Sequence, residues 1–158
     1  MRIEEFKQAV GAFPTGVCVI ATVFNNKLWG FTANSFVSIS LSPPLISYCL
    51  DAKSTSLPAF KQAEYFAISV LANDQAEISR HFAQRINNKF SSIEYHLAKS
   101  GVPCINGAIS FIECKKVKAI ECGDHLMFIG EVIKTQRDHN KMPLLYFAKS
   151  YREISDAN

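Results

Sequence analysis

The sequence lacks the paired cysteines and histidines that mark disulfide-stabilised or zinc-binding proteins. It contains five cysteines, an odd number, and neither a Cys-x-x-Cys nor a His-x-x-x-His pair. An odd count without close pairing argues against a disulfide framework, and the missing pairs argue against a zinc site. We therefore expect no metal. Cys18 and Cys49 lie inside apolar runs and are expected to be buried thiols, with a catalytic thiol as the alternative.

Long apolar runs, strong charge and glycine-rich phosphate loops are also missing. No apolar stretch approaches the roughly 20 residues that cross a bilayer. The acidic segment 1–5 has no signal-peptide core, so we expect a cytoplasmic chain that does not contact a membrane. The net charge of +3 is too small for a typical nucleic-acid-binding protein. No Gly-x-Gly-x-x-Gly motif follows a strand-like run, so a Rossmann site is not expected.

The sequence does contain enough apolar residues for one substantial core. It has 158 residues, of which 48% are hydrophobic and 20% are charged, as in ordinary globular proteins. This length suits one domain and is short for two. No repeat or linker divides the chain, so we expect a single domain over residues 1–158.

The spacing of apolar residues predicts a mainly β fold. Helical spacing predicts short helices at about residues 3–13, 57–63 and 74–84, and 85–101 reads as a loop with some helix. Strand-like runs cover residues 17–24, 28–37, 45–50, 65–71, 108–120, 125–135 and 144–147. This grouping favours an antiparallel β-barrel with flanking α-helices over a doubly wound sheet. Because such a barrel fills its own interior, a ligand would bind outside it, at loops or at a subunit interface.

A first candidate site lies between two strand-like runs, in the segment Gly30–Phe36 and just beyond it. Its short polar or small residues are Thr32, Ala33, Asn34, Ser35 and Ser38. Their hydroxyl and amide groups can donate or accept hydrogen bonds, which suits the edge of a heteroaromatic ring or a ribityl chain. The alternative is a polar strand end whose hydrogen bonds are satisfied locally.

A second candidate site is the cluster Lys53-Ser54-Thr55-Ser56, which follows the third strand-like run. An ammonium, three hydroxyls and backbone N–H groups leading into a helix can hold a phosphate. The alternative is ordinary helix capping beside a solvated lysine.

Two further positions could contact a ligand. His125 follows the turn-forming pair Gly123-Asp124, and a histidine there can orient a substrate or donate a hydrogen bond near neutral pH. Tyr146 could form an aromatic wall beside a ring-shaped ligand. The alternatives are a histidine at the edge of a turn and a core strand followed by an exposed tail at Tyr151-Arg152.

The order and spacing of these pieces, from about Phe6 to Arg152, resemble the flavin reductase-like family. The matching segments are Phe13–Val17, Gly30–Phe36 with Ser38 and Ser40, Pro43–Leu45, Lys53–Ser56, Phe66–Leu71, Asp74-Gln75, Phe82-Ala83, Gly123–His125, Gly130–Val132 and Pro143–Tyr146. One difference is Phe90, which stands where many relatives carry Trp. The resemblance implies a split antiparallel β-barrel with flanking α-helices.

The resemblance also implies an activity. Such a protein would be a homodimeric NAD(P)H:flavin oxidoreductase that binds FMN or FAD and takes hydride from NADH or NADPH. It would supply reduced flavin to a partner monooxygenase. The alternatives are a flavoredoxin-like electron-transfer protein without NAD(P)H activity and a β-barrel with a degenerate site. The sequence does not choose between the two flavins or between the two nicotinamides.

Site residues follow from the same resemblance. Thr32, Ala33, Asn34, Ser35 and Ser38 would line the flavin ring and ribityl chain. Lys53, Ser54, Thr55 and Arg85 would hold the phosphate. His125 would be the catalytic residue on the nicotinamide side, together with Tyr146 and Thr15.

Overall fold

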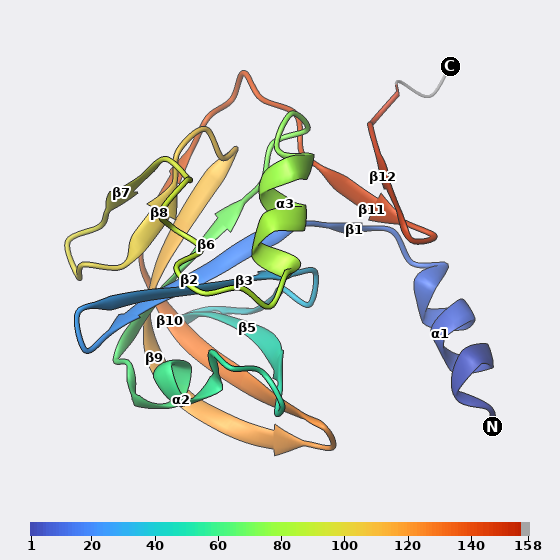
Figure 1. Cartoon of the computed structure of the whole chain (residues 1–158), viewed down its shortest axis with the longest axis horizontal. Coiled ribbons are helices and arrows are strands. Elements are labelled where there is room, and N and C mark those ends of the chain that lie inside the picture. The colour runs from blue at the N-terminus through green and yellow to red at the C-terminus, as the bar shows by residue number, and fades with distance from the viewer. Residues whose placement is uncertain (156–158) are drawn as a thin grey trace.

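A seven-stranded antiparallel sheet forms most of the computed structural model, which describes residues 1–155 (Figure 1). Its strands are β2 (Cys18–Phe24), β3 (Lys27–Ala33), β4 (Val37–Leu41), β5 (Pro44–Asp51), β6 (Tyr65–Val70), β9 (Ser110–Cys122) and β10 (His125–Arg137). Their order in the sheet is β3-β2-β6-β9-β10-β5-β4. The mainly β, antiparallel fold expected from the sequence is confirmed.

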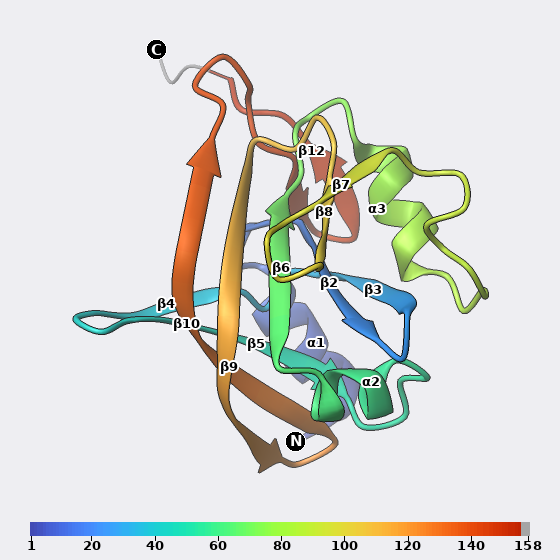
Figure 2. The same cartoon turned by 90° about the vertical axis from the view of Figure 1, so that its left-hand side faces the viewer.

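The sheet curls around an aromatic core but does not close. In Figure 2, β9 and β10 run along the molecule while β4 and β5 cross it. The rings of Tyr48 and Phe128 stack inside at 5.1 Å, and Phe66 meets Tyr48 edge-on at 5.0 Å. At the two ends of the strand order, β3 and β4 are not paired with each other, which leaves a seam. The filled interior agrees with the expectation that a ligand binds outside the barrel.

Three helices lie within residues 1–155, and they differ in how they contact the sheet. The helix α3 (Ala76–Ala83) packs on β2 and β3, and α2 (Leu57–Gln62) follows β5 and covers one end of the barrel (Figure 2). The helix α1 (Ile3–Gly11) stands away from the barrel and has no buried residue (Figure 1). Its apolar side therefore has no partner within the described chain. None of these helices is long and apolar enough to span a bilayer.

Two smaller sheets complete the structure. One contains β1 (Thr15–Gly16), β11 (Leu145–Phe147) and β12 (Ser150–Arg152), and the other contains β7 (Tyr95–Leu97) and β8 (Pro103–Ile105). The strand β7 corrects the sequence-based expectation of a loop with some helix at 85–101. The strand β12 places Tyr151-Arg152, expected as an exposed tail, in a small sheet, and of these two residues only Arg152 stays exposed. No element was predicted at β8. Each of these three strands has three residues, so it is held by its pairing partner rather than by its own propensity.

A further correction concerns the predicted strand 28–37. The structure ends β3 at Ala33 and begins β4 at Val37. The Ser35 hydroxyl interrupts the run because it accepts a hydrogen bond from the Cys49 N–H (3.0 Å) and donates one to the Cys49 carbonyl (3.3 Å). A side-chain contact to a distant strand thus splits one apolar run into two elements.

Candidate functional site

A pocket of about 360 Å³ lies between the ends of β3 and β5, beside the end of α3. Most of the predicted site residues line it. They are Thr32, Ala33, Asn34, Ser35, Ser54, Thr55, Arg85 and His125. Segments far apart in the sequence therefore converge on one cavity, whose volume lies in the usual range for small-molecule sites.

The structure does not bring the other three predicted residues into this pocket. Ser38 is exposed on β4, opposite Ile46 of β5. Lys53 is exposed in a turn, where its backbone N–H donates to Asp51 Oδ1 (2.7 Å). Tyr146 lies on β11 and lines a different cavity.

Two of the pocket hydroxyls are bound to the protein's own backbone. Thr32 Oγ1 donates to the Ser79 carbonyl of α3 at 2.6 Å, and Ser35 holds Cys49 as described above. The Asn34 side chain is exposed and makes no hydrogen bond within residues 1–155. Thr32 and Ser35 therefore shape the wall, while the Asn34 amide is the group left to meet a ring or a polyhydroxyl chain.

Hydroxyl and cationic groups meet on another side of the pocket. Ser54 Oγ accepts a hydrogen bond from the Ser56 N–H (3.3 Å), which is the capping contact considered from the sequence. Within the described part of the chain, the Thr55 hydroxyl has no hydrogen-bond partner and Arg85 forms no ion pair. Thr55 and Arg85 are therefore free to bind an anion.

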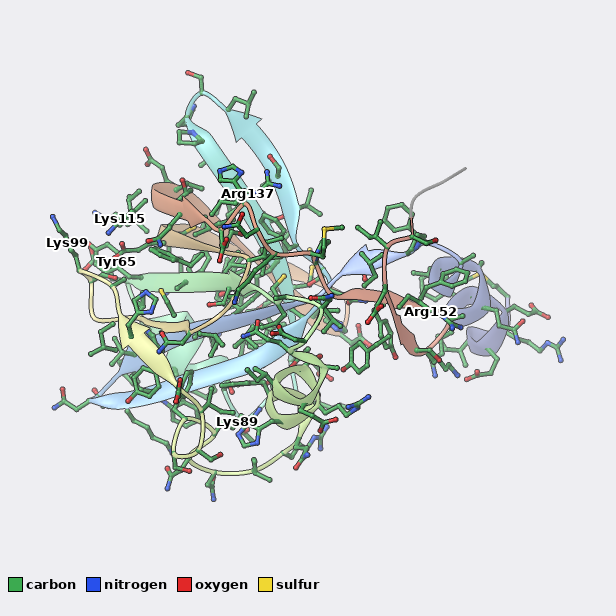
Figure 3. All side chains as sticks on the ribbon, turned by 90° about the horizontal axis from the view of Figure 1, so that it is seen from above. Tyr65, Lys89, Lys99, Lys115, Arg137 and Arg152 are labelled. Carbon is green, nitrogen blue, oxygen red and sulfur yellow. The ribbon has the colours of Figure 1, made fainter. Side chains whose placement is uncertain are left out.

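Lys89 also lines this pocket, although it is not among the site residues predicted from the sequence. Its Nζ donates to the carbonyls of Phe82 (2.7 Å) and Gly30 (3.2 Å), and its own carbonyl is hydrogen-bonded to His81 Nε2 (2.7 Å). Burial lowers the pKa of this half-buried ammonium. Among residues 1–155 no carboxylate forms an ion pair with it, so Lys89 brings an unpaired positive charge to a pocket that Asp51 also lines. Figure 3 labels Lys89 beside α3. The only sequence signal was a lysine in a polar, irregular segment.

His125 begins β10 at the edge of the pocket, with its side chain 44% exposed. Its Nδ1 lies 2.7 Å from Asp124 Oδ1. That hydrogen bond, and then the charge of His125, lowers the pKa of Asp124. With an ionised carboxylate as acceptor, Nδ1 carries the proton, and Nε2 is the nitrogen left for a ligand.

The cysteines do not provide a reactive thiol here. Cys18 is buried, as expected, and burial raises its pKa to about 12. Cys49 is only partly buried, which corrects the expectation, and it lines the pocket. Burial, and then the charge of Cys122, raises the pKa of Cys49. Neither thiol is ionised at neutral pH, so the alternative of a catalytic cysteine is not favoured. No cluster of three potential metal ligands occurs among residues 1–155.

A second, larger cavity of about 1100 Å³ adjoins the pocket and is mostly apolar. It lies between α1 and the small sheet of β1 and β11, and Tyr146 is part of its wall. Asn34 and Ser35 line both cavities. Thr15 Oγ1 is buried beside this cavity without a hydrogen-bond partner in the described residues. A ligand in each cavity would therefore meet at the Asn34-Ser35 wall.

The donor groups of the pocket fit a flavin nucleotide. Such a ligand has a flat polar ring, a polyhydroxyl chain and a phosphate. Asn34 can serve the polar ring or the chain, and the hydroxyls with Arg85 and Lys89 can serve the phosphate. The fit rests on the charged and hydrogen-bonding groups of these side chains that remain available to a ligand after their contacts within residues 1–155.

Comparisons with known proteins agree with this fit. Residues 10–155 match the model of the flavin reductase like domain. The chain is 39% identical over 153 residues to the FMN reductase (NADH) of Agrobacterium fabrum, covering 96% of this chain and 86% of that protein. It is 31% identical over 151 residues to a reductase subunit of a flavin-dependent monooxygenase of Rhodococcus jostii, covering 96% of this chain and 77% of that protein.

A solved structure gives the same result. The NADH:FAD oxidoreductase of Streptomyces globisporus, in complex with NAD and FAD fragments, superposes with a TM-score of 0.94 at 35% identity. The match covers 99% of this chain and 95% of that chain. This chain belongs to the flavin reductase-like domain family.

Proposed function

We propose that this NAD(P)H-dependent flavin reductase binds FMN or FAD in the 360 Å³ pocket and admits NADH or NADPH from the adjoining apolar cavity. The observation that carries the proposal is the shared wall at Asn34 and Ser35, with cationic groups elsewhere in the pocket. A flavin accepts hydride from a nicotinamide without a nucleophile from the protein, so the protein supplies binding and orientation. The pocket matches this need because it offers hydrogen-bonding groups and the cations Arg85 and Lys89, beside the carboxylate Asp51, and its thiol, Cys49, is not ionised at neutral pH.

In this proposal, the phosphate of the flavin nucleotide is bound mainly by positively charged side chains. Arg85 and Lys89 supply two cations, and Ser54 and Thr55 add hydroxyl donors. Hydrogen bonds from charged donors to phosphate are shorter and stronger than neutral ones. This assignment keeps Ser54, Thr55 and Arg85 of the sequence-based set and adds Lys89.

His125 serves the nicotinamide side. Asp124 hydrogen-bonds the imidazole at Nδ1, which leaves Nε2 as the ring nitrogen available to a ligand at the pocket edge. Nε2 can hold a hydrogen bond to a polar ligand atom and donates when the ring is protonated. Its role is to orient the donor, and no step requires it as a nucleophile.

Two partners belong to the proposal. A second copy of the chain would pack along the apolar side of α1 and form an outer wall of the 1100 Å³ cavity, so the nicotinamide would bind between the two copies. Phe6, Val10 and Phe13 line this cavity and are 47%, 56% and 75% exposed. A flavin-dependent monooxygenase would receive the reduced flavin. This is supported by the relative of Rhodococcus jostii, which is named as a reductase subunit of such an enzyme.

Steady-state turnover tests the function directly. Purified protein is mixed with NADH or NADPH and with FMN, FAD or riboflavin in all combinations, and nicotinamide absorbance is followed. Oxidation of at least one nicotinamide that depends on added flavin is expected. Tight flavin binding without oxidation of either nicotinamide would point instead to a flavin-binding electron-transfer protein, and absence of flavin binding would reject the site.

A further inference from the structure

We propose that Tyr151 is a positioning residue for hydride transfer. Its hydroxyl ties the small sheet that carries Tyr146 to α3, which forms part of the flavin pocket. The inference rests on the proposed function, because it concerns how the two cavities are held in a fixed position relative to each other. Tyr151 lies in neither cavity and acts through Ser79 and Tyr146.

The link is a short chain of hydrogen bonds centred on one residue of α3. The hydroxyls of Tyr151 and Ser79 lie 2.7 Å apart, and Ser79 is 1% exposed. The carbonyl of Ser79 accepts the hydrogen bond from Thr32 Oγ1 at 2.6 Å. Ser79 thus joins β3, at the flavin pocket, to β12, at the edge of the small sheet.

Tyr151 also holds Tyr146 by direct contact. The two residues face each other across β11 and β12, and their ring centroids lie 5.6 Å apart at 61°. On β11, Tyr146 in turn faces Thr15 of β1. The Arg80 guanidinium lies 4.9 Å from the centroid of the Tyr151 ring. The Tyr151 side chain is therefore fixed between α3 and the Tyr146 wall of the second cavity.

This arrangement affects the reaction because the cavities share only the Asn34-Ser35 wall and are otherwise built on different elements. The proposed flavin pocket is lined mainly by β3, β5 and α3, whereas the second cavity is lined by α1, β1 and β11 with single residues of β2, β4 and β6. Hydride transfer requires the reacting atoms at about 3–3.5 Å, and a misplacement of about 1 Å can slow a reaction by about 100-fold. The Tyr151–Ser79 bond limits movement of the Tyr146 wall relative to the flavin pocket. Losing it would disturb the approach of the donor more than the binding of the flavin.

The test uses Tyr151→Phe, Ser79→Ala and the double variant. Each single change removes one hydroxyl and leaves the packing of the remaining side chain in place. Tyr65→Phe is the matched control, because the Tyr65 hydroxyl has no hydrogen bond within residues 1–155. Tyr65 also lies far from Arg152, the neighbour of Tyr151 in β12 (Figure 3). Flavin Kd, the single-turnover rate constant of flavin reduction at saturating nicotinamide, and Tm are measured for all variants.

We expect flavin Kd to stay within about twofold in each variant while the reduction rate constant falls about 5- to 20-fold in both single variants. The double variant should be no slower than the slower single variant, because both changes break the same bond. Tyr65→Phe should match the wild type. If the role of Tyr151 were purely structural, Tm would fall, but the reduction rate constant would not fall while flavin Kd stayed unchanged.

Three results would overturn the inference. The first is a reduction rate constant in Tyr151→Phe within twofold of the wild-type value. The second is a fall in the reduction rate constant that is matched by an equal weakening of flavin binding. The third is a double variant whose fall in rate constant equals the product of the falls in the two single variants. If the wild type reduces flavin and Tyr151→Phe is unaffected, only the positioning role fails. If the wild type oxidises neither nicotinamide, the proposed function fails and the positioning role fails with it.

Discussion

At the scale of single residues, positive charge is concentrated on one side of the 360 Å³ pocket, at Arg85 and Lys89. Lys89 is half-buried, bound to two backbone carbonyls and not paired with a carboxylate among residues 1–155. An ammonium has three donors, so one remains for a ligand after the two carbonyl contacts. The energetic preference of this side of the pocket is therefore for an anion.

Replacing Lys89 with Met should weaken FMN binding by about 10- to 100-fold, because a hydrogen bond from a charged donor contributes about 1.5–3 kcal/mol. Riboflavin, which has the same ring and no phosphate, should bind as before. Fluorescence quenching of both flavins measures the difference. Lys99→Met, at the exposed turn between β7 and β8, is the control. Equal losses for FMN and riboflavin would show that Lys89 supports the wall and does not contact the phosphate.

The affinity for FMN should also depend on pH through Lys89. Only the protonated amine binds the phosphate, and burial lowers its pKa below the ordinary value of 10.5. As pH rises, FMN affinity should therefore fall at a lower pH than it would if the pKa of Lys89 were that of an ordinary lysine. Riboflavin, which has no phosphate, shows any effect of pH on binding of the flavin ring itself. Lys89→Arg should remove this dependence, because a guanidinium keeps its proton. An unchanged pH profile in that variant would contradict the assignment.

Replacing His125 with Ala should slow nicotinamide oxidation by about 10- to 100-fold, the scale expected when an orienting or proton-holding side chain is removed. Flavin Kd should change by less than about threefold, since binding rests on the cationic side of the pocket. His139→Ala, at an exposed loop position, serves as the control. A larger effect on flavin binding than on turnover would place His125 on the flavin side instead.

The sequence could predict the pocket residues that lie in compact polar clusters. Asn34, Ser54 and Thr55 stand out because short polar groups interrupt apolar runs, and the structure brings them to one cavity. Lys89 and Tyr151 gave no such signal, because their partners are backbone carbonyls and a buried hydroxyl far along the chain. The hydrogen bonds of Thr32 and Ser35 to the backbone of Ser79 and Cys49 likewise could not be predicted, because only the tertiary structure brings these partners together.

At the scale of elements, the long strands were predictable and the short ones were not. β2, β6 and β10 carry enough apolar residues to be recognised from their pattern. β7, β8 and β12 have three residues each, and they form because β7 pairs with β8 and β12 pairs with β11. The helix α3 begins at Ala76, slightly later than the predicted start at about residue 74. Gln75, at the N-cap position, uses its side chain to bond the Ala72 N–H and the Asn106 carbonyl.

Gly130 allows β10 to pass close to the core. A Cβ at this position would lie 2.4 Å from Phe66 Cζ, and the register of β10 with β9 shifts at the same point. Gly130→Ala should therefore destabilise the fold by about 1–3 kcal/mol or more through overpacking. Thermal unfolding measures the loss, and Gly11→Ala, where nothing lies within 4 Å, should not lower Tm. If Phe66→Leu does not recover part of the loss in the double variant, the clash is not the cause.

At the scale of the whole molecule, the described chain leaves its N-terminal helix uncovered. Ile3, Phe6, Val10 and the following Phe13 are between 47% and 75% exposed, and the last three line the 1100 Å³ cavity. An apolar surface of this kind is typical of an interface between subunits. It supports the proposal that a second copy of the chain packs here.

Phe13→Glu should shift the protein from a dimer toward the 17.6 kDa monomer, because it places a charge in the proposed apolar interface. Sedimentation velocity over a range of concentrations measures the shift. Leu97→Glu is the matched control, since Leu97 is 57% exposed on β7, on the opposite side of the molecule from α1 (Figure 1). A wild-type protein that sediments as a monomer would reject the proposed interface.

The hydroxyl of Ser35 has a mechanical consequence. Near the end of β3, the polypeptide is joined to β5 by this side chain, which bonds the backbone N–H and carbonyl of Cys49, and by the contact of the Phe31 and Tyr48 rings. The pocket lies at the same place. Widening the gap between β3 and β5 would break these two hydrogen bonds, each worth about 0.5–1.5 kcal/mol, and loosen that ring contact, but it would break no strand pairing, because β3 and β5 are not paired. A barrel fastened in this way can exchange a bulky ligand without unfolding a strand.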